Sequence, residues 1–386
     1  MDTPFLRGMT RATELTKAGK LEEATALIQS LMQSQATTED TAPFTDTDAL
    51  EGTFSTLGDG VPEQVRATAA KSPLSARRGL GETLRNITSG GMPQHSILKP
   101  TPSKLRDGAQ LLSLTYRGAQ GVREYRLYLP ANQPEAPMPL VVMLHGCTQT
   151  PEDFAAGTGM NTLAEEFGCV IAWPAQPQGA NAQKCWNWYR PEDQNRERGE
   201  PALLAGIVRE VLRDHPTDPA RVYIAGLSAG GAAAAIMGAA YPELFTAVGV
   251  HSGLPVGAAQ DIPSAFAAMR SGGQGKGRKM GVPVIVFHGL SDTTVHPDNG
   301  KAVAAQALQT WPELAQKRVS GISKGGYRYQ QTRISTAQGH SMVEHWEIEG
   351  AGHAWAGGTT AGSFTDPKGP DASREMLRFF LQHERT

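Results

Sequence analysis

The sequence predicts an α/β fold in which a mostly parallel central sheet is flanked by helices on both faces. Two observations support this prediction. Short continuous apolar runs, typical of strands covered on both faces, recur from about residue 139 onward. Segments with helical periodicity separate these runs, and such alternation is typical of parallel sheets, whose neighbouring strands need crossover connections.

The 386 residues divide by composition into three parts. Residues 1–35 have apolar side chains at helical spacing on either side of a break at Gly19 and are expected to form an N-terminal helical segment. Residues 36–104 are rich in Thr, Ser, Asp, Gly and Pro and are expected to form a poorly ordered linker. Residues 105–386 contain the alternating runs and are the expected globular domain.

Within the globular domain, each element is predicted from its local pattern. Two alternating segments, 111–118 and 123–130, predict an antiparallel hairpin that opens the sheet. Apolar runs predict further strands at 139–146, 168–174, 221–226, 246–253, 282–289 and 343–350. Helices are predicted at 153–167, 200–215, after Ser228, at 299–315 and at 373–384. We find no internal repeat.

Charge and composition limit the possible functions. A formal net charge of −2 gives no general attraction for nucleic acid or anionic membranes, so we expect no nucleic-acid partner. No stretch approaches the length of a membrane-spanning helix. The three cysteines are too few for a disulfide scaffold and lack zinc-ligand spacing, so no metal is expected. One disulfide plus one thiol and three free thiols are both compatible with the sequence.

The stretch Gly226-Leu227-Ser228-Ala229-Gly230 joins a predicted strand to a predicted helix. That is the context of a G-x-S-x-G nucleophile elbow. A serine held in strained backbone brings strand and helix so close that the residues two before and two after it must be small. In a chain with 43 glycines the five residues alone are weak evidence, but their position at this junction makes Ser228 the candidate nucleophile.

A serine hydroxyl needs a base to remove its proton and a carboxylate to orient that base. In α/β-hydrolases these groups follow in the order Ser, Asp or Glu, His, each in the loop after a later strand. Asp292 follows the strand predicted at 282–289, and His353 follows the strand predicted at 343–350. Ser228, Asp292 and His353 are therefore the predicted catalytic triad.

Other acids and histidines occupy positions less suited to these roles. Asp298 lies near an expected helix N-cap, and Asp261 lies in an irregular stretch. His288 ends the strand before the acid, and His296 lies in the Asp292 loop. The remaining candidates, interpreted as core-edge or surface histidines, are His251, His340 and His345.

An acyl-transfer site also needs N–H donors for the developing oxyanion. The N–H of Ala229, directly after the nucleophile, is the first candidate. The second donor normally comes from the loop after an early strand. There the turn His145-Gly146 makes the N–H of Cys147 the natural candidate.

Four motifs together, HGC at 145–147, CWNW at 185–188, GLSAGG at 226–231 and GHAW at 352–355, give a specific family resemblance. From about residue 110 to 383 the chain resembles the polyhydroxybutyrate depolymerase family of esterases, which includes feruloyl and acetylxylan esterase-like members. The resemblance implies an α/β-hydrolase fold and assigns the same triad and oxyanion donors. It also implies a disulfide between Cys147 and Cys185, with Cys169 left as a buried thiol.

The expected function is hydrolysis of carboxylic esters, of the polyhydroxyalkanoate oligomer or polyester type, without metal or organic cofactor. Feruloyl or acetylxylan-type carbohydrate esterase activity is the alternative. A peptidase of the same fold and a catalytically silent binding protein are further alternatives. Trp186 and Trp355 are expected to line the substrate pocket, because flat aromatic faces suit sugar rings, phenolic acids and polyester methyls alike.

The N-terminal sequence has no apolar core followed by a cleavage site, as a standard secretory signal would have. A cytoplasmic location is therefore favoured, and the extracellular location of secreted family members is the alternative. A further hypothesis gives the N-terminal helices a tethering role on a polymer granule or a protein. The sequence does not indicate the oligomeric state.

Overall fold

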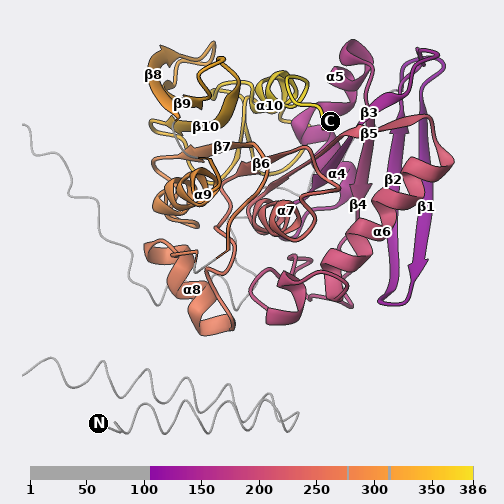
Figure 1. The fold of residues 1–386 in the computed structure, drawn as a ribbon, viewed down its shortest axis with the longest axis horizontal. Coiled ribbons are helices and arrows are strands. Elements are labelled where there is room, and N and C mark those ends of the chain that lie inside the picture. Colours follow the sequence, from indigo (N-terminus) through magenta and orange to yellow (C-terminus); the bar gives the residue numbers. More distant parts are fainter. Residues whose placement is uncertain (1–104, 276–277, 312–313, 386) are drawn as a thin grey trace, which may run out of the picture. The chain divides into compact units, whose positions relative to one another are not determined.

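The computed structural model describes residues 105–275, 278–311 and 314–385. Its centre is a ten-stranded sheet in the order β1-β2-β4-β3-β5-β6-β7-β10-β9-β8 (Figure 1). The strands from β4 to β10 in this order pair in parallel. Antiparallel hairpins, β1–β2 and β8–β9, extend the sheet at its two edges. The predicted mostly parallel sheet is confirmed, whereas the segments predicted at 1–35 and 36–104 lie outside the described residues.

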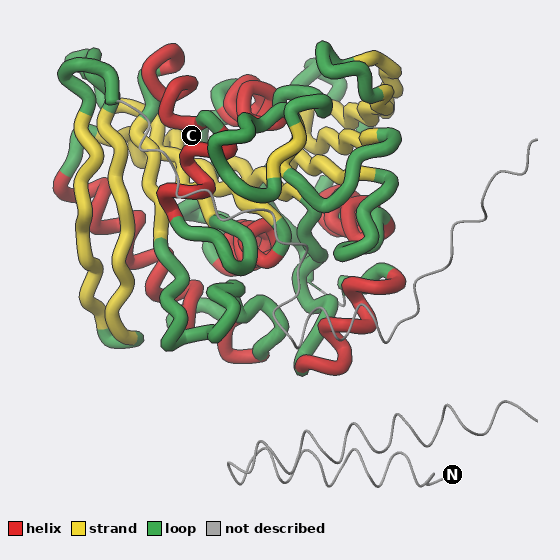
Figure 2. The backbone as a smooth tube through the Cα atoms, turned by 180° about the vertical axis from the view of Figure 1, so that it is seen from behind, coloured by secondary structure: helices red, strands yellow, loops and turns green. Residues whose placement is uncertain are grey.

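Ten strands form the main sheet and two form a separate short ladder. The strands of the main sheet are β1 Gln110–Gly118, β2 Gly121–Leu129, β3 Met138–Leu144, β4 Val170–Pro174, β5 Thr217–Leu227, β6 Ala247–His251, β7 Val284–Gly289, β8 Ala315–Ile322, β9 Arg328–Ser335 and β10 Ser341–Ile348. The short ladder pairs β11 Trp355–Ala356 with β12 Thr365–Asp366. Figure 2 shows the long β1–β2 hairpin from behind, at the left edge of the view.

Helices cover both faces of the sheet, and each face has its own apolar core. One face is covered by α6 Gly199–Asp214, α7 Ala229–Ala240, α8 Ile262–Ser271 and α9 Asp298–Leu308. The other face is covered by α4 Pro151–Thr158, α5 Met160–Phe167 and α10 Ala372–Phe380. A short 3₁₀ helix, η1, spans Pro191–Gln194. No helix among the described residues is both long and apolar enough to cross a membrane.

The central strands are apolar throughout because both of their faces are covered. Every residue of β3, β4, β6 and β7 is buried. Strands covered by helices on both faces have no solvent-facing side. Their residues therefore do not alternate between polar and apolar, as residues of strands with one exposed face do. This burial pattern explains why the apolar runs were sufficient to predict these strands.

The structure differs from the sequence prediction in several elements. The single helix predicted at 153–167 is broken into α4 and α5 at Gly159, whose φ of 64° is a left-handed conformation. The helix predicted at 299–315 ends at Leu308, and β8 begins at Ala315. The β8–β9 hairpin was not predicted, and neither was α8. Asp261, which was assigned to an irregular stretch, caps α8 by accepting the Ser264 N–H at 2.8 Å.

Candidate active site

Ser228 lies between the end of β5 and the start of α7 in a strained backbone conformation. Its φ is 58° and its ψ is −119°, values that non-glycine residues rarely adopt. The Ser228 N–H donates to the carbonyl of His251 on the neighbouring strand β6 at 2.9 Å, which anchors the turn to the sheet. The serine is 9% exposed.

The glycines around Ser228 are required by close backbone contacts. A Cβ on Gly226 would lie 2.4 Å from the carbonyl of Gly230, and a Cβ on Gly230 would lie 2.1 Å from the carbonyl oxygen of Leu144. Real Cβ atoms do not approach other atoms this closely. The steric explanation that was given for the small residues of the elbow is therefore confirmed.

The predicted acid and base form a buried hydrogen-bonded pair. His353 Nδ1 lies 2.7 Å from Asp292 Oδ2, and the other carboxylate oxygen accepts the N–H groups of Thr294 and Val295, each at 2.9 Å. The Asp292 side chain is fully buried, whereas 13% of the His353 side chain is exposed. The pair thus presents the outer edge of the imidazole while the carboxylate stays away from water.

The hydrogen bonds keep Asp292 ionised despite its burial. Burial raises the pKa of this carboxyl, but hydrogen bonds from His288 and His353, the charge of His353 and the Val295 N–H outweigh it. The pKa of Asp292 therefore lies well below its usual value. A carboxylate of this kind can stabilise an imidazolium on His353.

Sheet order brings the acid and base loops to the edge at which Ser228 lies. Strands β5, β6, β7 and β10 are consecutive neighbours and run in parallel, so their carboxyl ends meet at one edge. The two loops touch, because the Ser291 N–H donates to the carbonyl of Ala351 at 2.9 Å. No hydrogen bond joins Ser228 Oγ to His353 within the part of the chain that the structure describes. Such contacts are often long before substrate binds.

The predicted oxyanion donors follow β3 and β5, which are neighbours in the sheet. In the described part of the chain, the N–H groups of Cys147 and Ala229 donate to no protein acceptor. The turn at Cys147 is held by the Gly146 N–H, which donates to Gln149 Oε1 at 2.9 Å, and by Thr148 in a left-handed conformation with a φ of 67°. Both N–H groups are therefore free to donate to a substrate oxygen.

A disulfide joins Cys147 to Cys185 and links the loop after β3 to the loop that carries Trp186. Cys169 is the free, buried cysteine. The indole N–H of Trp186 donates to the carbonyl of His145 at 3.0 Å, and His145 Nε2 accepts the Gln176 N–H at 3.1 Å. Burial lowers the pKa of His145 to about 4, although its contact with the Gly146 carbonyl acts in the opposite direction. His145 is therefore neutral and serves as a rigid spacer.

A buried carboxylate that was not anticipated holds the loop of Trp186. Glu200, in the first turn of α6, accepts the backbone and side-chain N–H groups of Asn187, each at 2.8 Å, and also the side-chain amide of Gln176. Burial raises the pKa of Glu200, and the nearby charge of Asp193 adds to this effect. In the sequence, a glutamate at a helix start indicates only a favourable interaction with the helix dipole.

The expectation that Trp186 and Trp355 line a pocket needs correction, because both side chains are completely buried. Trp186 packs in the core under the oxyanion loop. Trp355 lies in the opposite core, where it stacks on His251 with 5.0 Å between ring centres and donates to Ser373 Oγ at 2.9 Å. Both rings therefore pack in the core beneath the site residues and do not line a pocket.

Two histidines interpreted as core-edge or surface residues are core residues. His251 is 1% exposed, its ring lies between Trp355 and Phe287, and its Nε2 accepts the Ala356 N–H at 2.9 Å. His345 is 7% exposed. His340 is exposed, as expected. Burial lowers the pKa of both His251 and His345 to about 3, so both are neutral in ordinary buffers.

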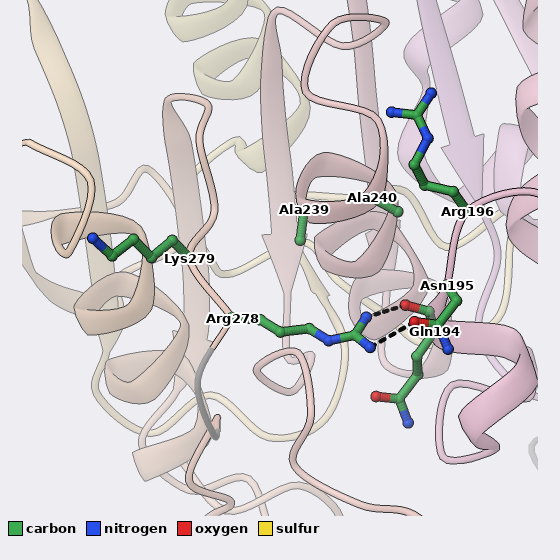
Figure 3. A pocket seen from close by; sticks show the side chains of 7 residues that line it. All are labelled: Gln194, Asn195, Arg196, Ala239, Ala240, Arg278 and Lys279. Atoms are coloured by element: carbon green, nitrogen blue, oxygen red, sulfur yellow. Dashed lines mark hydrogen bonds between the residues drawn. The ribbon is translucent and has the colours of Figure 1, made fainter.

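A surface pocket of about 320 Å³ lies away from these residues (Figure 3). It is lined by Ala239 and Ala240 at the end of α7, by Gln194, Asn195 and Arg196, and by Arg278 and Lys279. Ser228 lies at the other end of α7, whose 12 residues span roughly 18 Å. The guanidinium of Arg278 is occupied by Gln194 and Asn195, so we assign the pocket no part in the chemistry.

No three His, Cys, Asp or Glu side chains of the described residues are grouped as a metal site would require. The expectation that catalysis needs no metal remains a prediction.

Comparison with known proteins identifies the relatives of this chain. Residues 123–314 match the family model described as Esterase PHB depolymerase. A poly(3-hydroxyalkanoate) depolymerase C of Paucimonas lemoignei is 33% identical over 240 residues, which cover 58% of this chain and 57% of that protein. Feruloyl esterase B of Thermothelomyces thermophilus is 29% identical over 228 residues, which cover 52% of this chain and 75% of that protein.

A solved structure shows the same fold. Acetyl xylan esterase from Aspergillus awamori superposes with a TM-score of 0.54 at 20% identity, covering 71% of this chain and 99% of that one. The chain spans little more than half the length of the two depolymerases it matches, 57% of one and 51% of the other. The domain has the α/β-hydrolase fold, and its residues 123–314 match the polyhydroxybutyrate depolymerase family of esterases.

Proposed function

We propose that this chain is a serine esterase that hydrolyses carboxylic ester bonds through an acyl-enzyme formed on Ser228. The observation that carries the proposal is the buried pair of Asp292 and His353, 2.7 Å apart, at the sheet edge where the strained serine lies. A base already oriented by a carboxylate beside a serine in an elbow is the arrangement that nucleophilic acyl transfer requires.

In the proposed reaction, His353 Nε2 takes the proton of the Ser228 hydroxyl while Oγ attacks the ester carbonyl carbon. Asp292 accepts the Nδ1–H of His353 and stabilises the imidazolium that forms. His353 then gives its proton to the departing alcohol. A water molecule, deprotonated by the same base, hydrolyses the acyl-enzyme and releases the acid.

The N–H groups of Cys147 and Ala229 are proposed to stabilise the oxyanion of both tetrahedral intermediates. Such donors act where negative charge develops, and removing one commonly lowers kcat by about 10² to 10³. Support comes from their positions after the adjacent strands β3 and β5 and from the lack of a protein acceptor for either group in the described chain. The disulfide at Cys147 limits movement of the first donor.

Replacement of the nucleophile tests the proposal. We expect Ser228→Ala to lower kcat for a short p-nitrophenyl ester by about 10⁴ to 10⁶, with an unchanged circular dichroism spectrum and melting temperature. The wild-type chain should react with a fluorophosphonate probe, and the variant should not. Near-normal hydrolysis by the variant would exclude Ser228 as the nucleophile. A folded wild-type chain that neither hydrolyses esters nor takes up the probe would instead be a silent binding protein.

The proposed substrate is a polyhydroxyalkanoate-type oligomer or polyester. Of the two relatives described above, the depolymerase is more similar to this chain than the feruloyl esterase, 33% against 29% identical. Rates on hydroxybutyrate oligomers, feruloyl sugars, acetylated xylan and matched anilides test the choice. Highest kcat/KM on the oligomers supports it. Preference for the sugar esters favours a carbohydrate esterase, and preference for the anilides favours a peptidase.

A further inference from the structure

A second buried histidine, besides His353, lies against the proposed catalytic acid. His288 is the next-to-last residue of β7 and is completely buried. Its Nε2 lies 2.9 Å from the carbonyl oxygen of Val295 and 3.5 Å from Asp292 Oδ2. The same carboxylate oxygen thus faces both His353 and His288, although the proposed reaction uses only His353.

The contact with the Val295 carbonyl determines which nitrogen of His288 carries the proton. A carbonyl oxygen only accepts hydrogen bonds, so Nε2 must be protonated, and its N–H points into the space shared by Val295 and Asp292. The other ring nitrogen, Nδ1, has no hydrogen-bond partner among the described residues. An unpaired buried nitrogen costs free energy that an apolar side chain would not cost. The hydrogen bond from the Nε2–H offsets this cost.

Val295 couples the histidine to the acid. Its N–H donates to Asp292 Oδ1 at 2.9 Å, and its carbonyl accepts from His288. The short turn from Asp292 to Val295 is therefore held at both of its ends. Val295 is itself completely buried.

Helix α9 fixes the His288 ring from the other side. A Cβ on Gly300, in the first turn of α9, would lie 2.8 Å from Nδ1 and 3.1 Å from the Cβ of His288. The helix can pack this closely on the ring only because residue 300 is a glycine. The ring therefore has little room to turn.

We propose that His288 is a positioning residue for the esterase reaction: its Nε2–H fixes the Asp292 turn and orients the carboxylate toward His353. This inference rests on the proposed function and adds a residue to that site. This role of His288 differs from simple packing, because it depends on the Nε2–H group. An apolar side chain of similar size fills the same space without supplying this hydrogen bond.

Loss of that N–H has a defined electrostatic effect. The Nε2–H of His288, 3.5 Å from Asp292 Oδ2, stabilises the negative charge of Asp292, so without it the carboxylate attracts the proton of His353 more strongly. The acidic limb of the kcat/KM profile then moves to higher pH, because His353 must be neutral to act as the base. Loosening of the carboxylate also lowers kcat, by about 10- to 100-fold.

Other titratable groups around His288 do not produce the same shift. They come from every element packed against it, namely His251 on β6, His345 on β10, His353, and Asp298 and Lys301 on α9. His251 and His345 remain neutral above about pH 4, since burial lowers the pKa of each to about 3. Asp298 and Lys301 pair with each other at 2.9 Å on the surface and keep their charges.

The test compares His288→Leu with His288→Gln, whose side-chain N–H can reach the Val295 carbonyl. We expect His288→Leu to lower kcat 10- to 100-fold with KM nearly unchanged and to move the acidic limb upward, and His288→Gln to restore most of both. His345→Gln is the matched control: a buried histidine on the adjacent strand, with no hydrogen bond to Asp292. It should leave kcat and the limb unchanged.

Two results would overturn the inference: an unmoved acidic limb with wild-type kcat in His288→Leu, or equal losses in the Leu and Gln variants with an unmoved limb. If His288→Leu does not fold, His288→Asn replaces it, since its shorter amide does not reach Val295. The proposal is then supported if the acidic limb of the kcat/KM profile shifts in His288→Asn but not in His288→Gln. Identical pH profiles for the two variants contradict it. All comparisons use wild-type protein that has been shown to react with the fluorophosphonate probe. Failure of the esterase proposal is then recognised by the lack of labelling, separately from failure of the His288 proposal.

Discussion

The two sides of Ser228 are built in different ways. On one side, beyond β6, hydrogen bonds between buried side chains hold the acid and the base. On the other side, after β3, a disulfide and the buried carboxylate of Glu200 hold the loop of the oxyanion donor. Both sides contain a buried carboxylate with several N–H donors, yet their pKa values shift in opposite directions.

The neighbouring charges explain the difference. Asp292 is surrounded by histidines, and their hydrogen bonds overcome the effect of burial on its pKa. Glu200 has the carboxylate of Asp193 next to it, and the Glu200 N–H donates to that carboxylate at 2.8 Å. Burial alone therefore does not identify a catalytic carboxylate. The proposed catalytic acid is the one whose partners favour its charge, whereas Glu200 serves to hold a loop.

The largest effect is expected on the acid–base side. Asp292→Asn should lower kcat by about 10⁴, because an amide beside Nδ1 stabilises the wrong tautomer of His353. Steady-state kinetics on a p-nitrophenyl ester and the rate of fluorophosphonate labelling measure the loss. Asp298→Asn, at an exposed aspartate that begins α9, is the control and should stay near wild type. A loss below tenfold in Asp292→Asn would mean that another group orients the base.

A smaller effect on kcat is expected on the oxyanion side. Cys185→Ser removes the disulfide, whose cysteines are 38 residues apart, and should cost about 2–4 kcal/mol in the free energy of unfolding. It should also lower kcat about 10- to 100-fold, because the Cys147 N–H is held less firmly. Urea unfolding and kinetics measure both. Cys169→Ala removes a buried free thiol and should leave kcat unchanged. Equal kcat in Cys185→Ser and wild type would show that the loop keeps its geometry without the bond.

The smallest effect is expected in the pH dependence of stability, where the two carboxylates should differ in sign. Asp292, with its lowered pKa, stabilises the fold above the unfolded pKa of about 3.9, and this contribution is lost as pH falls through the folded pKa. Glu200, with its raised pKa, destabilises the fold as pH rises above about 4.3, because the unfolded state loses its proton first.

Urea unfolding from well below pH 3.9 up to pH 8 separates the two contributions. Compared with Glu200→Gln, the wild type should lose stability as pH rises. Compared with Asp292→Asn, the wild type should lose stability only toward the acidic end of the range. If the difference in the free energy of unfolding changed with pH in the same direction in both comparisons, the two carboxylates would not differ in their effect on stability.

Features whose physical cause is local were predicted from the sequence. The elbow glycines were predictable because a close strand–helix contact restricts side-chain size, and Gly226 and Gly230 do lie against backbone atoms. The core strands were predictable because burial on both faces leaves only apolar residues. The β8–β9 hairpin was missed because almost every residue of β8 is exposed, so its sequence shows neither an apolar run nor a regular alternation.

The succession of core strands along the chain and the candidate residues were thus predicted from the sequence itself, since elbow, acid and base each follow a strand of recognisable pattern. Only the tertiary structure decided what surrounds them. Trp186 and Trp355 became buried supports, Glu200 came to hold the Trp186 loop, and His288 came to face Asp292. The physical reason is that burial and hydrogen bonding depend on groups from distant parts of the chain, which no local pattern contains.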